Sequence, residues 1–251
     1  MLSAGTRRTL LLLACTLLMA CPDKGPDPAE IAADAARRAR DAKALFMEAE
    51  ARMVPEKIAL YRRILALFPE TPDALLARMK LVFYLRDPVV NQPEEALKEA
   101  EAFAAASPGD LRASECFRWL DSDAGEKLDV VMRKRVQDGW RKHLDAARAA
   151  AKTLTAIERM SLWLECADME RRSREPAKAI AYYAEALTFE APRQDLVLRA
   201  LFDKARVEID DPLLHAAARE DLEKALVLSR AGVKGATVDE ITLHLQRLNP
   251  R

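Results

Sequence analysis

Apolar side chains recur at steps of three or four residues along most of the chain after Pro28, and no segment alternates strictly between polar and apolar residues. A repeat of 3.6 residues belongs to helices that bury one face, whereas half-buried strands repeat every two residues. The 7 glycines and the 6% of aromatic residues also provide little material for the turns and strands of a β-barrel or sandwich. We therefore expect an all-α protein.

Prolines and short polar segments divide this pattern into eleven expected helices. We expect them at residues 29–53 and 55–69, 72–86 and 93–107, 111–120 and 125–152, 154–174 and 176–190, 194–209 and 212–230, and 237–248. The sequence thus predicts about five helical hairpins followed by a C-terminal capping helix. Pro55, Pro72, Pro93 and Pro176 stand where helices are expected to begin, which suits a residue without a backbone N–H.

The first twenty residues have the pattern of an export signal. Arg7 and Arg8 precede the apolar run of residues 9–19, and the small residue Ala20 comes directly before Cys21. The four residues Leu18-Met19-Ala20-Cys21 resemble the lipobox of bacterial lipoproteins. This resemblance implies cleavage before Cys21, lipidation of its sulfur and anchoring in a membrane of the cell envelope. The alternative is an ordinary cleaved signal in which the cysteine occurs by chance.

This interpretation divides the chain into a lipoprotein signal peptide (1–20), a short proline-rich tether (21–28) and a helical domain (29–251). Asp23 does not directly follow the lipidated cysteine, so the resemblance implies the outer membrane over the inner one. The chain has 40 basic and 40 acidic residues, and removal of the signal with its two arginines leaves a net charge of −2. A protein without a basic excess is not expected to bind nucleic acid.

One pattern of residues occurs three times. The first copy is Ile58, Tyr61, Ile64, Leu65 and Pro69. The second copy follows after an offset of 39 residues and is Leu97, Ala100, Phe103, Ala104 and Pro108. The third copy is Ala179, Tyr183, Ala186, Leu187 and Pro192. The pattern resembles the second helix and exit turn of a tetratricopeptide (TPR) repeat. Before the third copy, Trp163 and Ala167 match the first helix of that repeat, whereas Glu170 stands where the family has tyrosine.

The TPR resemblance implies a right-handed solenoid whose concave wall is lined by the first helix of each hairpin. A partner protein or peptide is expected to bind there. By position, the exposed residues of this wall are Arg78, Leu85, Leu164, Asp168, Arg171 and Arg172. Arg171 and Arg172 are candidates for pairing with carboxylates of the partner.

The expected helix 125–152 is basic, and Arg133, Lys134, Arg135, Arg141 and Lys142 are its candidate binding residues. They form either a patch for anionic lipid or an acidic partner, or an ordinary solvated face. The apolar residues of this helix, Trp140 among them, follow a separate stripe. We therefore favour a solvated face and a buried Trp140.

No motif in the sequence indicates catalysis. His143, His215 and His244 are the only histidines, and none belongs to a metal-binding pattern; phosphate-binding glycine loops and nucleophile motifs are also missing from the sequence. We expect no enzymatic activity, no cofactor, no metal and no small-molecule substrate. Cys116 and Cys166 are interpreted as buried thiols, and a disulfide between them is the alternative.

These features favour a membrane-anchored scaffold that holds a partner protein in the cell envelope. Phe68-Pro69-Glu70-Thr71-Pro72 resembles β-barrel-assembly lipoproteins of the BamD type. A pilotin-like lipoprotein for secretion or pili is equally compatible with the sequence. A protein of another class, a structural or peptidoglycan-binding lipoprotein that uses the basic helix, is the third possibility.

Overall fold

The computed structural model describes residues 27–127, 129–190 and 193–248, with the side chains of residues 123–127 left out. Every regular element in these ranges is helical, which confirms the all-α prediction. The predicted signal peptide, Cys21 and the tether up to residue 26 lie outside the described residues. Asp27 caps the first described helix, α2, and Pro28 is the first residue of that helix.

The described residues form eleven α-helices and two short 3₁₀ turns. They are α2 (Pro28–Glu50), α3 (Val54–Leu67), α4 (Pro72–Leu85), α5 (Pro93–Ala106), α6 (Arg112–Lys127), α7 (Val130–Ala149), η1 (Ala151–Thr153), α8 (Ala156–Arg172), α9 (Pro176–Ala186), α10 (Gln194–Glu208), η2 (Pro212–Leu214), α11 (His215–Arg230) and α12 (Val238–Arg247).

Local chemistry explains where these helices begin. Proline occupies one of the first two positions of α2, α3, α4, α5 and α9, where a backbone N–H has no helical partner in any case. α8 and α12 begin with a reciprocal capping box, formed by Thr155 with Glu158 and by Thr237 with Glu240. The starts predicted at the prolines are therefore confirmed.

Three predicted boundaries in the third hairpin were wrong. α6 continues to Lys127 instead of ending near residue 120, and α7 begins at Val130 instead of 125. The side chain of Asp129 accepts a hydrogen bond of 2.7 Å from the N–H of Met132, which defines the start of α7. α7 ends at Ala149, and the remainder of the predicted helix is the turn η1.

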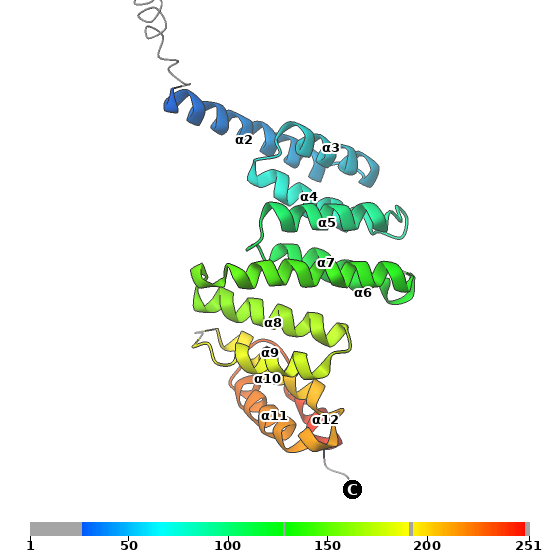
Figure 1. The fold of residues 1–251 in the computed structure, drawn as a ribbon, viewed down its shortest axis with the longest axis vertical. Helices are drawn as coiled ribbons and strands as arrows, with labels where there is room; N and C mark the ends of the chain where they lie inside the picture. The colour runs from blue at the N-terminus through cyan, green and yellow to red at the C-terminus, as the bar shows by residue number, and fades with distance from the viewer. Residues whose placement is uncertain (1–26, 128, 191–192, 249–251) are drawn as a thin grey trace, which may run out of the picture.

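Consecutive helices pack against each other in pairs, and the pairs follow one another along the longest axis of the molecule (Figure 1). We call α2, α4, α6, α8 and α10 the first helices, and α3, α5, α7, α9 and α11 the second helices. Contacts also join α4 to α2 and α6, α8 to α10, and α5 to α7. These contacts connect neighbouring pairs in addition to those between consecutive helices, and α12 packs on α11.

The positions of the threefold pattern lie in the core. Its central residues Tyr61, Ala100 and Tyr183 are fully buried in the second helices α3, α5 and α9. Small residues in this pattern allow close approach of neighbouring helices, and the large rings fill the space between pairs. Trp140 of α7 is also fully buried, which confirms its predicted place in the core.

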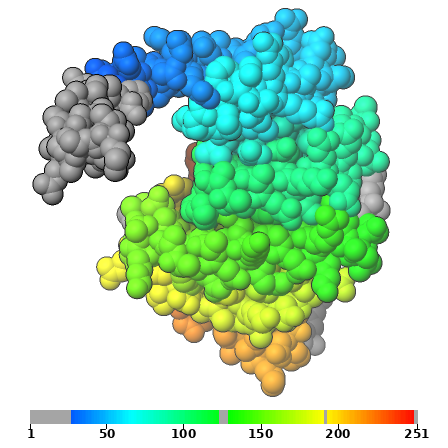
Figure 2. All heavy atoms as spheres, turned by 45° about the horizontal axis from the view of Figure 1, so that its top comes forward, coloured from blue at the N-terminus to red at the C-terminus, as the bar shows by residue number. Residues whose placement is uncertain are grey.

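The first half of α2 contributes nothing to this core. Ile31 is 53% exposed and Ala35 is exposed, although both belong to the apolar stripe of this helix. In Figure 2 the start of α2 projects away from the body, because this helix is longer than α4, on which it packs. Burial begins only at Ala42.

Cys116 and Cys166 are both buried free thiols, as the sequence favoured. Burial raises the pKa of each thiol to about 12. None of the described helices combines the length and apolar character that crossing a membrane requires.

Candidate functional site

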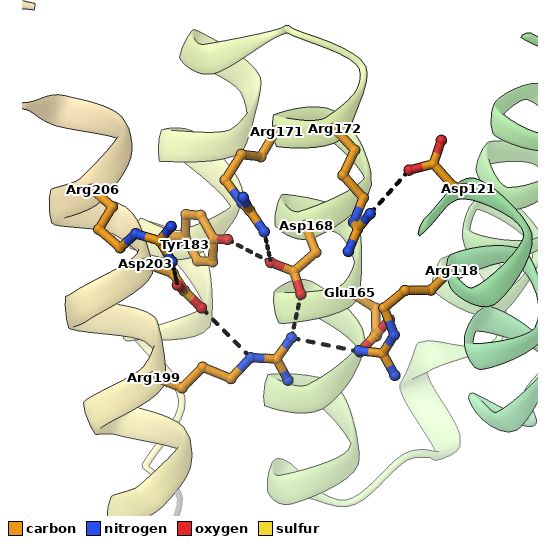
Figure 3. A network of polar contacts seen from close by, with 10 residues as sticks. All are labelled: Arg118, Asp121, Glu165, Asp168, Arg171, Arg172, Tyr183, Arg199, Asp203 and Arg206. Atoms are coloured by element: carbon orange, nitrogen blue, oxygen red, sulfur yellow. Dashed lines mark hydrogen bonds and ion pairs between the residues drawn. The ribbon is translucent and has the colours of Figure 1, made fainter. Parts of the chain in front are cut away.

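A network of ionic contacts crosses three of the first helices (Figure 3). We call the following residues the ionic network: Arg118 and Asp121 of α6, Glu165, Asp168, Arg171 and Arg172 of α8, Tyr183 of α9, and Arg199, Asp203 and Arg206 of α10. It therefore joins the third, fourth and fifth helical pairs on the layer of the first helices.

Asp168 lies at the centre of the ionic network. Its Oδ1 accepts a hydrogen bond of 2.7 Å from the Tyr183 hydroxyl and lies 3.6 Å from a nitrogen of Arg171, and its Oδ2 pairs with Arg199. These partners come from α9, from the next turn of α8 and from α10. A charged group can be buried when it is paired and hydrogen-bonded, and the carboxylate of Asp168 has three such partners.

Two ion pairs connect α8 to α6. Glu165 lies 3.3 Å from Arg118, and Arg172 lies 3.1 Å from Asp121. Glu165 also faces α10, where a nitrogen of Arg199 is 3.7 Å away. One helical face of α8 thus presents side chains to both neighbouring first helices, because positions 165, 168 and 172 are three or four residues apart.

Burial changes the electrostatics of this cluster. It raises the pKa of Glu165 above its ordinary value, against the attraction of Arg118 and Arg199. Burial and the nearby carboxylate of Asp168 likewise raise the pKa of Asp203. The ionic network contains five arginines and four carboxylates, so its formal charge is positive. The side chains of these arginines are between 27% and 45% exposed. A partner's anionic groups can therefore reach them.

An aromatic cluster joins α6 to α4. Phe83 is 42% exposed, and its ring meets the Trp119 ring edge-on with 5.7 Å between the centroids. The Arg86 guanidinium lies 5.0 Å from the Phe83 centroid and 5.7 Å from that of Trp119. Trp119 directly follows Arg118 of the ionic network in the chain, so α6 carries members of both groups, with Trp119 facing Phe83 of α4 and Arg118 facing Glu165 of α8.

Three of the six residues predicted for the binding wall are buried, so the prediction that they are exposed was wrong. Leu85 and Leu164 are completely buried, and Asp168 is buried at the centre of the ionic network. Leu85 belongs to the core together with Leu81 of the same helix. Leu164 is covered because α8 packs against α7, α9 and α10 at once.

The other three predicted wall residues are half-buried and paired. Arg78 lies 2.8 Å from Glu99 of α5, within its own helical pair. Arg171 and Arg172 are members of the ionic network, where they contact Asp168 and Asp121. Arg118, Arg199 and the aromatic cluster were not predicted from the sequence. The acidic and basic residues spaced along one face of α8 were the available signal, but their partners lie 31 to 51 positions away in the chain.

The predicted basic patch is not one continuous surface. Arg135 pairs with Glu94 of α5 at 2.8 Å, and Arg141 lies 3.5 Å from Glu170 of α8. Arg133 is half-buried, whereas Lys134 and Lys142 are exposed. Carboxylates of neighbouring helices thus neutralise part of the charge of α7, in agreement with the favoured interpretation as a solvated face.

The ionic network and the aromatic cluster together offer charge, hydrogen-bond donors and apolar area on one layer of the fold. Arginine and aromatic side chains are the residue types that contribute most often to protein interfaces. Comparison with protein-family models and with curated proteins found no match to this sequence.

Proposed function

We propose that this protein is a lipoprotein of the bacterial cell envelope that holds a partner protein. In this proposal the helical pairs form a right-handed, TPR-like solenoid, and the first helices line its concave face. The consecutive pairing of helices and the buried positions of the threefold pattern support this architecture. The role is one of binding, without catalysis and without a cofactor.

The ionic network is the observation that carries this proposal. Its arginines are half-exposed on neighbouring first helices, and the aromatic cluster includes Trp119 of α6, one of these helices. A partner segment with acidic side chains and an apolar residue complements this surface in charge and in hydrophobicity. Arg171 and Arg172 are the predicted wall residues that retain this role, whereas the buried Leu85 and Leu164 support the surface from below.

The anchor in this proposal is the lipidated Cys21, with the outer membrane as the favoured location. Six residues lie between Cys21 and Pro28, where α2 begins, so seven backbone steps join them. An extended chain of that length reaches at most about 25 Å. The helical domain would therefore stay close to the membrane surface, and its partner would be bound there.

Site-specific photocrosslinking in the native host tests the proposed binding face. A photoreactive amino acid at Phe83 or Arg171 is expected to form a crosslink to one defined protein, because both side chains are accessible on the first helices. The matched control is Ala149, an exposed residue of the second helix α7. Equal crosslinking from Ala149, or none from Phe83 and Arg171, would contradict the proposal. Mass spectrometry of the product distinguishes barrel-assembly, secretin and pilus proteins.

Metabolic labelling with a palmitate analogue tests the anchor separately. The wild-type protein is expected to acquire the label and to fractionate with membranes, and the Cys21→Ser variant is expected to do neither. Labelling that persists in the variant would exclude lipidation at this residue. The two experiments thus test the proposed binding face and the proposed anchor independently of each other.

A further inference from the structure

A pocket of about 510 Å³ lies between the second helices α5 and α7, away from the ionic network. Its walls include Ala102, Ala104 and Ala105 of α5 and Gly139 and Ala146 of α7, and Phe117 of α6 also lines it. Pockets that bind small molecules usually have volumes of about 300 to 1,000 Å³ and mostly apolar walls with a few polar groups. This pocket has both properties.

His143 is the polar group that distinguishes this pocket. It is only 3% exposed, and neither ring nitrogen has a hydrogen-bond partner among the described residues. Burial lowers its pKa despite the nearby carboxylate of Asp110, which favours the neutral imidazole. A buried polar group without a partner typically costs about 1 to 3 kcal/mol. An apolar residue would avoid this cost, and Val136, Trp140 and Leu144 fill the neighbouring core positions of α7.

Gly139 is a second residue on the same face of α7 that lowers the stability of the fold. It lies four residues before His143, and a glycine inside a helix is less favourable than alanine by about 1 kcal/mol. A Cβ at this position would lie 2.9 Å from Cε1 of Phe117, so the glycine lets the phenyl ring approach the pocket wall. Two residues that lower stability and line the same pocket indicate that the pocket has a function.

The chemistry of the lining defines the ligand. Lys142 and Glu101 are the charged residues that line the pocket, and their opposite charges favour an uncharged ligand. A hydroxyl group can accept from one imidazole nitrogen or donate to the other, so it suits His143 in either tautomer. The Phe117 and His143 rings, with centroids 6.3 Å apart, favour an aromatic body.

We propose that this pocket binds a small uncharged phenol, whose ring packs between α5 and α7 and whose hydroxyl bonds to His143. Both nitrogens of His143 are shielded from solvent, so the lining side chains must shift slightly when the ligand enters. The hydroxyl then pairs with His143 out of contact with bulk water, where a hydrogen bond contributes more than at the surface.

Titration of the full chain with 4-ethylphenol, followed by NMR of the imidazole resonances, tests the proposal. The protein has only three histidines, and the His143→Phe variant assigns the signal of His143. We expect 4-ethylphenol to shift the His143 resonances saturably while His215 and His244 stay unchanged. Ethylbenzene, which lacks the hydroxyl, is expected to bind roughly tenfold more weakly, the effect of about 1.4 kcal/mol.

Two variants locate the binding. Ala146 is exposed and lines the pocket, so Ala146→Trp fills the pocket without changing the core and is expected to weaken binding of 4-ethylphenol at least tenfold. Ala149→Trp, at an exposed residue of the same helix outside the pocket, is expected to bind as the wild type does. Unchanged His143 resonances, equal shifts of all three histidines, or unaltered binding by Ala146→Trp would overturn the proposal.

The His143→Phe variant tests the role of His143 in a protein that is expected to stay folded. Because this substitution removes two unpaired nitrogens from the interior, it is expected to raise the melting temperature. The same variant should no longer prefer 4-ethylphenol to ethylbenzene, as measured by calorimetry. A variant that is more stable and keeps this preference would show that His143 does not bind the hydroxyl.

Discussion

The hydroxyl of Tyr183 donates a hydrogen bond of 2.7 Å to Oδ1 of Asp168, and both residues are buried. The bond connects the second helix of the fourth pair to the residue at the centre of the ionic network. Tyr183 also occupies the aromatic position of the threefold pattern. One side chain thus fills the core with its ring and orients the candidate binding face with its hydroxyl.

We expect Tyr183→Phe to lower the free energy of unfolding by about 1.5 to 3 kcal/mol, the usual contribution of a hydrogen bond to a charged group. The ring and its packing are kept, so the loss reports on the hydroxyl. Tyr182→Phe is the matched control, because its hydroxyl bonds to Arg148 at a half-exposed position. Urea denaturation measures the free energy of unfolding of both variants. An equal decrease in the two would contradict the central role of Asp168.

Glu165 is expected to make stability depend on pH in the direction opposite to an ordinary ion-paired carboxylate. Its pKa is higher in the folded protein than in the unfolded chain, so the folded state binds the proton more tightly. The contribution of this group to stability is therefore fully present below its unfolded pKa and is lost as the pH rises through the folded pKa.

Comparison of the wild type with Glu165→Gln isolates this effect, because glutamine does not titrate. The free energy of unfolding of the wild type, relative to that of the variant, should increase as the pH is lowered from about 8 to about 5. Denaturant titrations at several pH values measure this difference. A difference that stays constant or decreases over this range would show that the pKa of Glu165 is not raised.

Arg174 is expected to be a position where glycine stabilises the protein. Its φ of +61° is left-handed, and it follows α8 in a Schellman motif in which the N–H of Glu175 bonds to the carbonyl of Glu170 at 2.9 Å. Arg174→Gly removes the steric cost of a side chain in this conformation, and we expect a gain of roughly 0.5 to 1 kcal/mol. Arg174→Ala retains the Cβ and should give no such gain. Thermal denaturation of the two variants decides between these outcomes.

Cys116 and Cys166 are expected to be unreactive in the folded protein. Both thiols are buried, and burial raises the pKa of each to about 12, so almost no thiolate exists at neutral pH. A colorimetric thiol reagent should detect neither thiol in the native Cys15→Ser/Cys21→Ser double variant, whose only cysteines are Cys116 and Cys166, and both of them in urea. Detection of no thiol in urea without reductant would indicate a disulfide instead.

Prediction from the sequence worked best where a residue acts through its own local chemistry. Pro72, Pro93 and Pro176 begin helices because proline lacks the N–H that a first-turn residue does not need. Boundaries without such a residue were less accurate, as in the third hairpin. The end of α6 carries no proline, and the capping role of Asp129 was not predicted.

The candidate binding face could be predicted only in part. Arg171 and Arg172 were identified by their places on a helix, and both are half-exposed in the ionic network. Leu164 and Asp168 follow the same helical spacing but are buried, because α8 packs against three other helices. Periodicity defines one apolar stripe for a helix, and it does not show how many neighbours cover the remaining faces.

By itself the sequence determined the all-α class, the number and approximate extent of the helices, their pairing along the chain and the burial of Trp140. These properties depend on residues close together in the chain. Only the tertiary structure decided which charges meet: Asp168 with Arg199, Arg172 with Asp121 and Arg135 with Glu94. It also decided that His143 lies beside a pocket without a hydrogen-bond partner among the described residues. Such contacts join positions far apart in the sequence, and they exist only once the helical pairs have packed.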